Sequence, residues 1–230
     1  MLIGILETGL APDALRARAG SYPDMFARLL APHGFTFRSW SVVNMDFPDS
    51  VHDAEGWLIT GSRHGVYDDL PFIAPLEALI RQAMAEAVPV VGICFGHQIV
   101  AQALGGRVEK FHGGWAVGPQ DYDFDGAPVR LLAWHQDQVI EPPAGAEVIA
   151  THPFCSFAGL RYGDRALTVQ AHPEYDDAFL QGLIETRGRG LVPDDRLAAA
   201  LDRLGGRTDA DAIAARIAGF FRQPRHGAAA

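Results

Sequence analysis

The chain has 230 residues, of which 48% are apolar and 20% charged, a composition typical of globular proteins and not of disordered ones. At about 150 residues per domain, this length corresponds to one or two domains. The 19 Lys and Arg residues against 28 Asp and Glu residues give a net charge of −9. Because so acidic a chain lacks the basic stripe that binds a phosphate backbone, we expect no nucleic-acid partner.

The cysteines and the first residues point to a compartment. Cys94 and Cys155 are too few for a disulfide framework, and both can stay reduced in a cytosol. The apolar start, Met1–Leu6, has no basic leader and meets Glu7 at once, which is typical of a buried strand rather than a signal peptide. No apolar run approaches the ~18 residues of a membrane span. We therefore expect a cytoplasmic protein with no membrane partner.

Short apolar runs alternate with amphipathic stretches along the first hundred residues. A helix is expected to begin near Gly96 and to end at Gly105-Gly106. Strands separated by helices in this rhythm form parallel βαβ units, with helices on both faces of the sheet. The strands predicted here are Leu2–Leu6, Phe35–Val43, Gly56–Thr60 and Val88–Ile93. The other predicted helices are Tyr22–Leu30 and Phe72–Ala87.

The pattern changes between Arg107 and Gln170, where strand-like segments follow one another with only Gly or Pro between them. We expect mostly antiparallel strands here, over Val129–Trp134, Glu147–Thr151, Phe154–Leu160 and Ala166–Gln170. Helices return over Asp176–Thr186, Asp194–Leu204 and Ala210–Phe221. The sequence thus predicts one α/β domain over residues 1–223 and a flexible tail over 224–230.

The most informative segment for chemistry reads Val-Gly-Ile-Cys-Phe-Gly-His-Gln and contains Cys94. Gly92 and Gly96 flank Cys94 in the pattern Gly-x-Cys-x-Gly, the thiol form of the nucleophile elbow, whose sharp turn needs small neighbours. The sulfur would stand at the carboxyl end of a strand, where a helix N-terminus favours the thiolate and backbone N–H groups receive an oxyanion. Taken alone, the pattern fits a small buried cysteine about equally well.

A base for this thiol is found in His172-Pro173-Glu174, directly after the last predicted strand. At the carboxyl end of that strand, His172 could meet Cys94 across neighbouring strands. His172 would take the thiol proton and return a proton to the leaving amine, and Glu174 would orient the imidazole. A histidine in a surface turn is the alternative, but it leaves the elbow and the nearby carboxylate unexplained.

With both motifs in this order, the chain resembles the class I, or triad, glutamine amidotransferases over almost its whole length. The resemblance implies an α/β fold that is flavodoxin-like, with a central mostly parallel sheet, helices on both faces and a smaller antiparallel strand region. It implies Cys94 as nucleophile, His172 as base and Glu174 as orienting acid. The implied reaction is hydrolysis of the γ-amide of glutamine through a Cys94 glutamyl thioester, which gives glutamate and ammonia.

The resemblance extends to residues around the triad. The backbone N–H groups of Gly61, in Thr-Gly-Ser-Arg-His, and of Phe95 correspond to the family's oxyanion hole. No His-Glu-x-x-His motif is present, and His152-x-x-Cys155 lacks a second ligand pair, so we expect no metal site and no cofactor. Substrate contacts are expected from Gln98, Trp115, His135 and Gln136.

Two departures from the family pattern concern the substrate. Ser62-Arg63-His64 replaces the compact Gly-Gly-Pro turn, and the following Tyr67-Asp68-Asp69 looks more like the stand-alone γ-glutamyl peptidases. Ala116 stands where relatives often carry an acidic residue. A γ-glutamyl peptidase is therefore an alternative function. A non-catalytic binding module of the same fold is another, although such a module has no physical reason to keep a nucleophile and its base.

The end of the chain bears on possible partners. It follows soon after the His-Pro-Glu motif, and no phosphate-binding signature is present. We therefore expect no ATP-using synthetase domain in this chain, so released ammonia would pass to a separate synthetase subunit or to solvent. The acceptor and the oligomeric state stay open.

Overall fold

The computed structural model describes residues 1–224, and its main sheet has nine strands in the order β2-β1-β3-β4-β11-β10-β9-β6-β7. The first five strands in this order are parallel to one another. They are β2 (Thr36–Trp40), β1 (Leu2–Leu6), β3 (Gly56–Ile59), β4 (Val90–Ile93) and β11 (Ala166–Val169).

Antiparallel strands extend the same sheet beyond β11. These are β10 (Cys155–Tyr162), β9 (Glu147–His152), β6 (Ala116–Phe124) and β7 (Ala127–His135). A small separate sheet pairs β5 (Arg107–Lys110) with β8 (Asp137–Glu141). The predicted fold class, a mostly parallel central sheet with a smaller antiparallel region, is confirmed.

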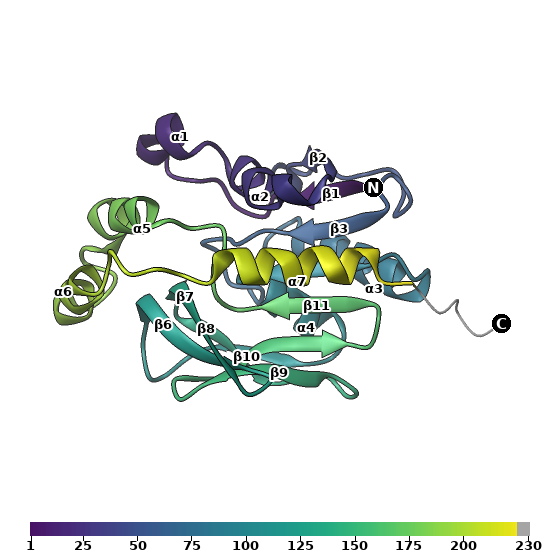
Figure 1. The fold of residues 1–230 in the computed structure, drawn as a ribbon. Helices are drawn as coiled ribbons and strands as arrows, with labels where there is room; N and C mark the ends of the chain where they lie inside the picture. Colours follow the sequence, from purple (N-terminus) through teal and green to yellow (C-terminus); the bar gives the residue numbers. More distant parts are fainter. Residues whose placement is uncertain (225–230) are drawn as a thin grey trace.

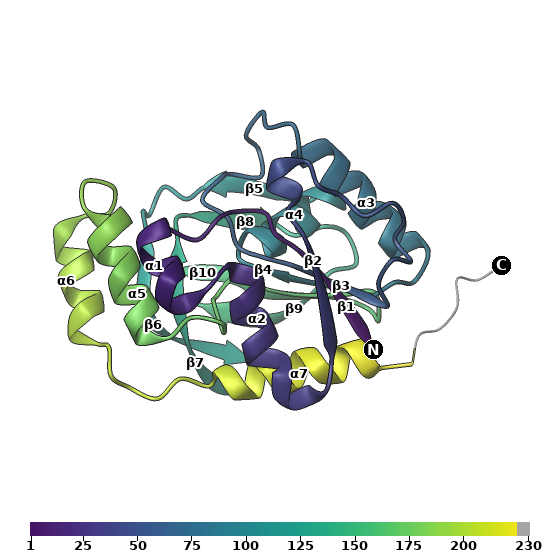
Figure 2. The same ribbon diagram turned by 90° about the horizontal axis from the view of Figure 1, so that it is seen from above.

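Helices cover both faces of the parallel strands, as Figure 2 shows. On one side lie α3 (Ile73–Ala85) and α4 (Phe95–Ala103), and on the other lie α2 (Tyr22–Leu30) and α7 (Ala210–Arg222). Each pair of helices closes an apolar core against the sheet. Burial from both sides explains why these strands are continuous apolar runs in the sequence.

Three further helices lie beyond the carboxyl ends of the parallel strands (Figure 1). They are α1 (Asp13–Ala19), α5 (Asp177–Leu183) and α6 (Asp194–Asp202). A third apolar cluster joins Phe179 and Leu197 of these helices to Val117 and Leu132 of β6 and β7. This wall stands at the edge of the sheet where parallel α/β folds place their ligands.

Some predicted boundaries differ from the structure. The strand predicted over Phe35–Val43 ends at Trp40, because the backbone turns into a short 3-10 segment, Val42–Asn44. The helix predicted over Asp176–Thr186 is α-helical only as far as Leu183 and continues as a π-helical turn. The predicted tail, 224–230, lies outside the described residues except for Pro224. The single domain over residues 1–223 stays a prediction.

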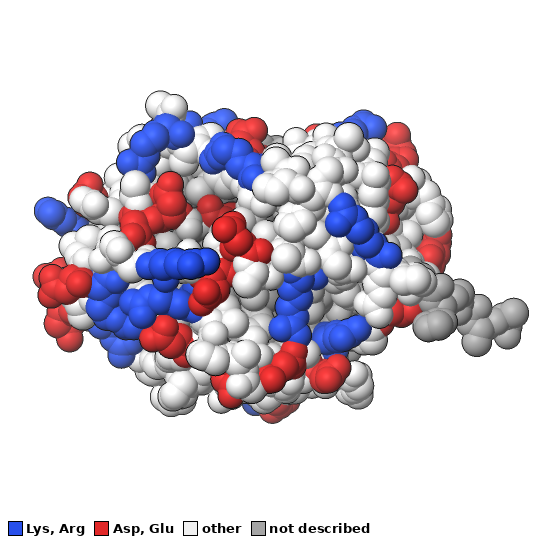
Figure 3. All heavy atoms as spheres, viewed as in Figure 1, with Lys and Arg blue, Asp and Glu red and all other residues white. Residues whose placement is uncertain are grey.

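Surface charge and helix hydropathy bear on whether nucleic acid or a membrane is a partner. On the face in Figure 3, acidic side chains lie among the basic ones, so no uninterrupted basic stripe crosses that face. Within residues 1–224, no helix combines the length and apolar character needed to cross a bilayer. The cytoplasmic location stays a prediction.

Candidate active site

Cys94 occupies a strained turn between β4 and α4. Its φ is +54° and its ψ is −103°, a region that side chains rarely adopt and that is often found at functional sites. The two flanking glycines make the turn possible. A Cβ on Gly92 would lie 2.4 Å from the carbonyl oxygen of Gly96, and a Cβ on Gly96 would lie 2.3 Å from the carbonyl oxygen of Ile59. The geometry therefore has the form of the predicted elbow.

His172 and Glu174 follow β11, the strand next to β4. Nδ1 of His172 lies 2.7 Å from Oε1 of Glu174, and their side chains are 3% and 0% exposed. The backbone N–H of His172 donates to the carbonyl oxygen of Leu132 in β7 at 2.9 Å, which fixes the segment against the antiparallel strands. Nε2 is buried and has no hydrogen-bond partner of good geometry within residues 1–224, so it is available to a reacting group.

The charges around His172 favour its protonated form. Burial alone would lower the pKa of the imidazole, but the charges of Glu174 and Cys94 outweigh it and raise this pKa to about 10. At neutral pH the proton therefore resides on His172, beside Cys94.

Tyr175 holds the plane of the imidazole. Its ring stacks on His172 with centroids 4.0 Å apart and planes 5° apart. The hydroxyl group of Tyr175 lies 3.5 Å from that of Tyr22 in α2. His172 is thus fixed by a carboxylate at its edge and by an aromatic ring on its face.

The turn that carries Gly61 lies against both Cys94 and His172. A Cβ on Gly61 would lie 2.9 Å from Cε1 of His172 and 3.6 Å from Cβ of Cys94. Thr8 stabilises this turn, because its hydroxyl lies within hydrogen-bond distance of the carbonyl oxygens of Thr60, at 2.9 Å, and of Gly61, at 3.1 Å. The hydroxyl has one proton, so it donates to one of these carbonyl oxygens at a time, and either bond holds the turn in place. Nothing in the sequence marks Thr8 for this role.

Phe95 is the first residue of α4, and the first-turn N–H groups of a helix have no partner within it. Its side chain is 1% exposed and packs in the core, so only its backbone can serve the site. The backbone N–H group of Gly61, in the turn after β3, and that of Phe95, at the start of α4, thus belong to two segments next to Cys94.

A cavity of about 130 Å³ opens beside Cys94 and His172. Four other predicted residues line it: Gln98, Trp115, His135 and Gln136. Glu174 lies behind His172 and is not among the lining residues. The remaining lining residues are Tyr22, Ser62, Arg63, His64, Trp134, Asp137, Tyr175, Arg187 and Leu191.

Polar side chains on one side of the cavity are held by the backbone. Nε2 of Gln98 donates to the carbonyl oxygen of Asp137 at 2.9 Å and to Oε1 of Gln170 at 3.1 Å, so its own Oε1 is the atom left for a ligand. Nδ1 of His135 faces the same Asp137 carbonyl at 3.1 Å and must therefore carry the ring proton. Burial lowers the pKa of His135 to about 3, so the ring stays neutral and Nε2 is an acceptor.

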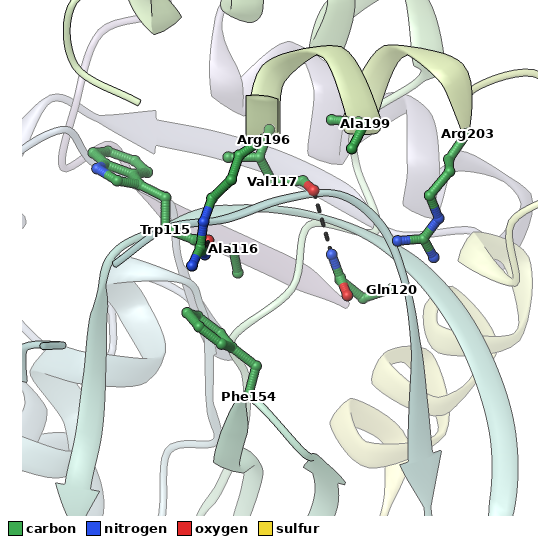
Figure 4. Close-up of a pocket in the computed structure, with 9 residues that line it drawn as sticks. Trp115, Ala116, Val117, Gln120, Phe154, Arg196, Ala199 and Arg203 are labelled. Atoms are coloured by element: carbon green, nitrogen blue, oxygen red, sulfur yellow. Dashed lines mark hydrogen bonds between the residues drawn. The ribbon is translucent and has the colours of Figure 1, made fainter. Parts of the chain in front are cut away.

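Trp115 separates this cavity from a second, more open pocket of about 230 Å³, shown in Figure 4. Arg196 of α6 reaches across that pocket and donates hydrogen bonds to the carbonyl oxygens of Trp115 and, at 3.0 Å, of Gly113. Its guanidinium also lies 5.4 Å from the centre of the Phe154 ring. Arg196 thereby holds the segment that presents Trp115 to the cavity beside Cys94, where the ring centroids of Trp115 and Trp134 lie 5.7 Å apart.

Sequence reasoning missed four lining residues: Tyr22, Tyr175, Arg187 and Leu191. Tyr175 follows the His-Pro-Glu motif directly, which is a signal that could have found it. Tyr22, Arg187 and Leu191 come from distant elements that only the tertiary fold brings to the cavity. Within residues 1–224, no group of three or more His, Cys, Asp or Glu side chains is placed to hold a metal ion.

Known proteins share this sequence pattern and this fold. The family model described as glutamine amidotransferase class-I matches residues 26–178, and the chain belongs to that family. Gamma-glutamyl peptidase 4 of Arabidopsis thaliana is 32% identical over 192 residues, which cover 76% of each chain. A glutamine amidotransferase-like protein of Schizosaccharomyces pombe is 26% identical over 95% of this chain and 98% of its own length.

Two further similarities concern a larger enzyme and a solved structure. GMP synthase (glutamine-hydrolyzing) of Listeria innocua is 32% identical over 154 residues, which are 63% of this chain but 27% of that protein. The crystal structure of a glutamine amidotransferase from Methylobacillus flagellatus superimposes with a TM-score of 0.72 at 21% identity, covering 98% of this chain and 96% of that one. This second similarity shows a shared fold.

Proposed function

We propose that this chain hydrolyses the amide bond of γ-glutamyl substrates through a glutamyl thioester on Cys94. The observation that carries the proposal is the position of His172 at the carboxyl ends of β4 and β11. Nδ1 of its ring contacts the carboxylate of Glu174, and the charge of Cys94 favours the protonated form of the ring. A strained nucleophile, a charged imidazole and a buried carboxylate are the parts that thiol acyl transfer requires.

The first half-reaction forms the thioester. The Cys94 thiolate attacks the γ-carbonyl carbon, and the backbone N–H groups of Gly61 and Phe95 stabilise the oxyanion that develops. As the C–N bond breaks, the His172 imidazolium gives its proton to the leaving nitrogen. Glu174 stabilises the imidazolium before this transfer and keeps Nε2 directed at the reacting atoms.

The second half-reaction releases the acid. Neutral His172 takes a proton from a water molecule, whose oxygen attacks the thioester carbon. The C–S bond breaks, glutamate leaves and the thiolate–imidazolium pair is restored. One water is consumed for each amide bond cleaved.

Glutamine is the first candidate substrate, as the family membership suggests. Gamma-glutamyl peptides are the second candidate, and two observations favour them. The relatives named gamma-glutamyl peptidase 4 and gamma-glutamyl peptidase 2 align with 76% of this chain, at 32% and 28% identity. The cavity also contains two arginines, Arg63 and Arg187, which suit a substrate with more than one carboxylate.

Glutamate release tests the proposal. We expect the wild type to release glutamate from glutamine or from a γ-glutamyl dipeptide, and Cys94→Ala to lower the rate by roughly 10⁴- to 10⁶-fold. Cys155→Ala is the matched control, because Cys155 is buried at the start of β10 and does not line the cavity. Equal activity of Cys94→Ala and the wild type would rule out the thioester mechanism.

A separate synthetase subunit that takes up ammonia stays a prediction. Co-purification of such a subunit with this chain would support transfer of ammonia between proteins. Glutamate release by the purified chain alone, at the full rate, would support independent hydrolysis.

A further inference from the structure

The cavity beside Cys94 is lined by groups of opposite charge. One is Asp137, whose carboxyl pKa is raised by burial while the Tyr67 hydroxyl and Lys110 oppose that rise. Tyr22 and Arg187 also line it, on elements that precede and follow the catalytic segments. The lining therefore offers both an acidic and a cationic side chain to a ligand.

Arg187 lies in the π-helical turn Ile184–Gly188 that continues α5. Such turns add a residue to a helix and are frequent at functional sites. Arg187 as a residue is half-buried, and Nη2 of its guanidinium donates to the carbonyl oxygen of Leu10 at 3.3 Å in an exposed position. No Asp or Glu within residues 1–224 forms an ion pair with it, although the chain has 28 acidic residues.

A guanidinium that lines a cavity and has no carboxylate partner favours an anionic ligand. Arg presents several N–H donors in a planar fork that matches a carboxylate. One carbonyl oxygen occupies only part of this capacity. The cavity in front of Arg187 therefore offers charge-assisted hydrogen bonds that the protein itself does not use.

Arg187 is connected to the catalytic residues through Tyr22, which lines the same cavity. Burial raises the pKa of Tyr22, the charge of Arg187 opposes this rise, and the charges of Glu174 and Cys94 add to it. Tyr22 is thus within electrostatic reach of both Arg187 and the catalytic residues. It also contacts Tyr175, which stacks on His172, the group that protonates the leaving nitrogen.

We propose that Arg187 binds the carboxylate of the leaving amino acid, so that this site cleaves γ-glutamyl amino acids in preference to glutamine. The proposal rests on the thioester mechanism described above and names the substrate class. When the γ-amide C–N bond breaks, the proton of His172 passes to the amino acid nitrogen. Water then releases glutamate from Cys94, so one dipeptide and one water give two free amino acids.

The lining of the cavity fits such a leaving group. Tyr22, Tyr175 and Leu191 contribute aromatic and apolar surface, against which an amino-acid side chain can pack. Ammonia, the leaving group of glutamine, has neither a side chain nor a carboxylate, so it would use none of these contacts.

The test compares γ-glutamyl-alanine, its C-terminal carboxamide and glutamine as substrates for the purified full chain. The wild type should prefer the free carboxylate over the carboxamide by roughly 10- to 100-fold in kcat/KM, the range expected of a charge-assisted hydrogen bond. In Arg187→Gln, this preference should fall to less than about threefold. Arg187→Lys keeps the charge and should keep part of the preference.

Arg189→Gln is the matched control, because Arg189 lies two residues further on, is exposed and does not line the cavity. It should leave the preference for the carboxylate unchanged. Thermal melting of each variant separates loss of the fold from loss of the subsite.

Two results would overturn the proposal while the thioester mechanism stands. One is a wild type that cleaves the carboxylate and carboxamide substrates equally well. The other is an Arg187→Gln variant that loses activity toward both by the same factor, since the ratio alone reports the carboxylate contact. If the wild type cleaves none of the three substrates, the thioester mechanism itself fails, and the subsite fails with it.

Discussion

Single residues determine whether the nucleophile can be presented at all. Gly96 fits against the backbone of β3, where an added Cβ would lie 2.3 Å from the carbonyl oxygen of Ile59. A backbone atom cannot move as a flexible side chain does, so α4 would have to shift away from the sheet. Gly96→Ala should therefore lower the free energy of unfolding by roughly 1–3 kcal/mol and also lower activity.

Gly219→Ala is the control for this substitution. Gly219 lies inside α7, has no positive φ, and a Cβ there would meet nothing within 4 Å. Because alanine favours helices, the variant should gain roughly 0.5–1 kcal/mol. Denaturant unfolding of both variants checks the pair, and a Gly96→Ala protein as stable as the wild type would contradict the packing argument.

Glu174 sets the charge state of His172, and this can be tested through pH. The pKa of His172 is raised to about 10, so the imidazolium needed as an acid is present at neutral pH and is lost as the pH rises through that value. Glu174→Gln removes a charge that raises this pKa. The alkaline fall of kcat/KM should then move to lower pH, and kcat should drop by roughly 10²- to 10⁴-fold.

The measurement is kcat/KM from neutral to alkaline pH for the wild type and for Glu174→Gln. Glu185→Gln, a change at an exposed glutamate that contacts Gln181, should leave the profile in place. An alkaline limb that stays at the same pH in Glu174→Gln would mean that Glu174 does not control His172.

At the scale of elements, α6 supports the candidate site from outside it. Arg196 of α6, drawn in Figure 4, donates hydrogen bonds to the backbone carbonyl oxygens of Gly113 and Trp115, and Trp115 also lines the cavity beside Cys94. Arg196→Ala should free this segment and raise KM by roughly tenfold, with a much smaller change in kcat. Arg196→Lys should restore part of the loss.

Arg203→Ala is the control for α6, because Arg203 lines the same outer pocket and forms no hydrogen bond to the Gly113–Trp115 segment. Its KM should stay within about twofold of the wild-type value. Equal increases in KM for the two variants would show that α6 acts only through general stability.

The elements that the sequence predicts best are those with a continuous apolar pattern. The parallel strands and the flanking helices have it, because both faces of the sheet are buried. In β6, by contrast, Pro119 interrupts the strand pattern, and the alternation of Asp121 and Asp123 with buried Tyr122 and Phe124, which is typical of a half-buried strand, is confined to the last four residues. The seven-residue α1 begins after Pro12 and has no periodic signal of its own, so neither element is predicted.

The same limit applies to the site. The residues of two local motifs, around Cys94 and His172, can be found from the sequence because each motif is contiguous. Arg187 and Tyr22 cannot, because they reach the cavity only when α2 and the π-helical turn pack at the edge of the sheet. Pattern analysis also gives no sign that a helix will continue as a π-helical turn.

At the scale of the whole molecule, the sheet order makes the site. The strands β4 and β11 are neighbours, with Ile93 opposite Val169, although the entire antiparallel extension separates them in the chain. The backbone N–H of Cys94 donates to the carbonyl oxygen of Val169 at 2.8 Å, which ties the elbow to the strand that leads to His172. The antiparallel extension returns through β7 to fix His172 from the other side.

The thioester on Cys94 is the central claim, and trapping it is the most direct test. The full chain would be mixed with a γ-glutamyl substrate, quenched in acid during turnover and examined by mass spectrometry after proteolysis. We predict an adduct of one glutamyl group on the peptide that contains Cys94, and none on the Cys155 peptide. Turnover without an adduct in Cys94→Ala at the wild-type rate, or an adduct on another residue, would contradict the account.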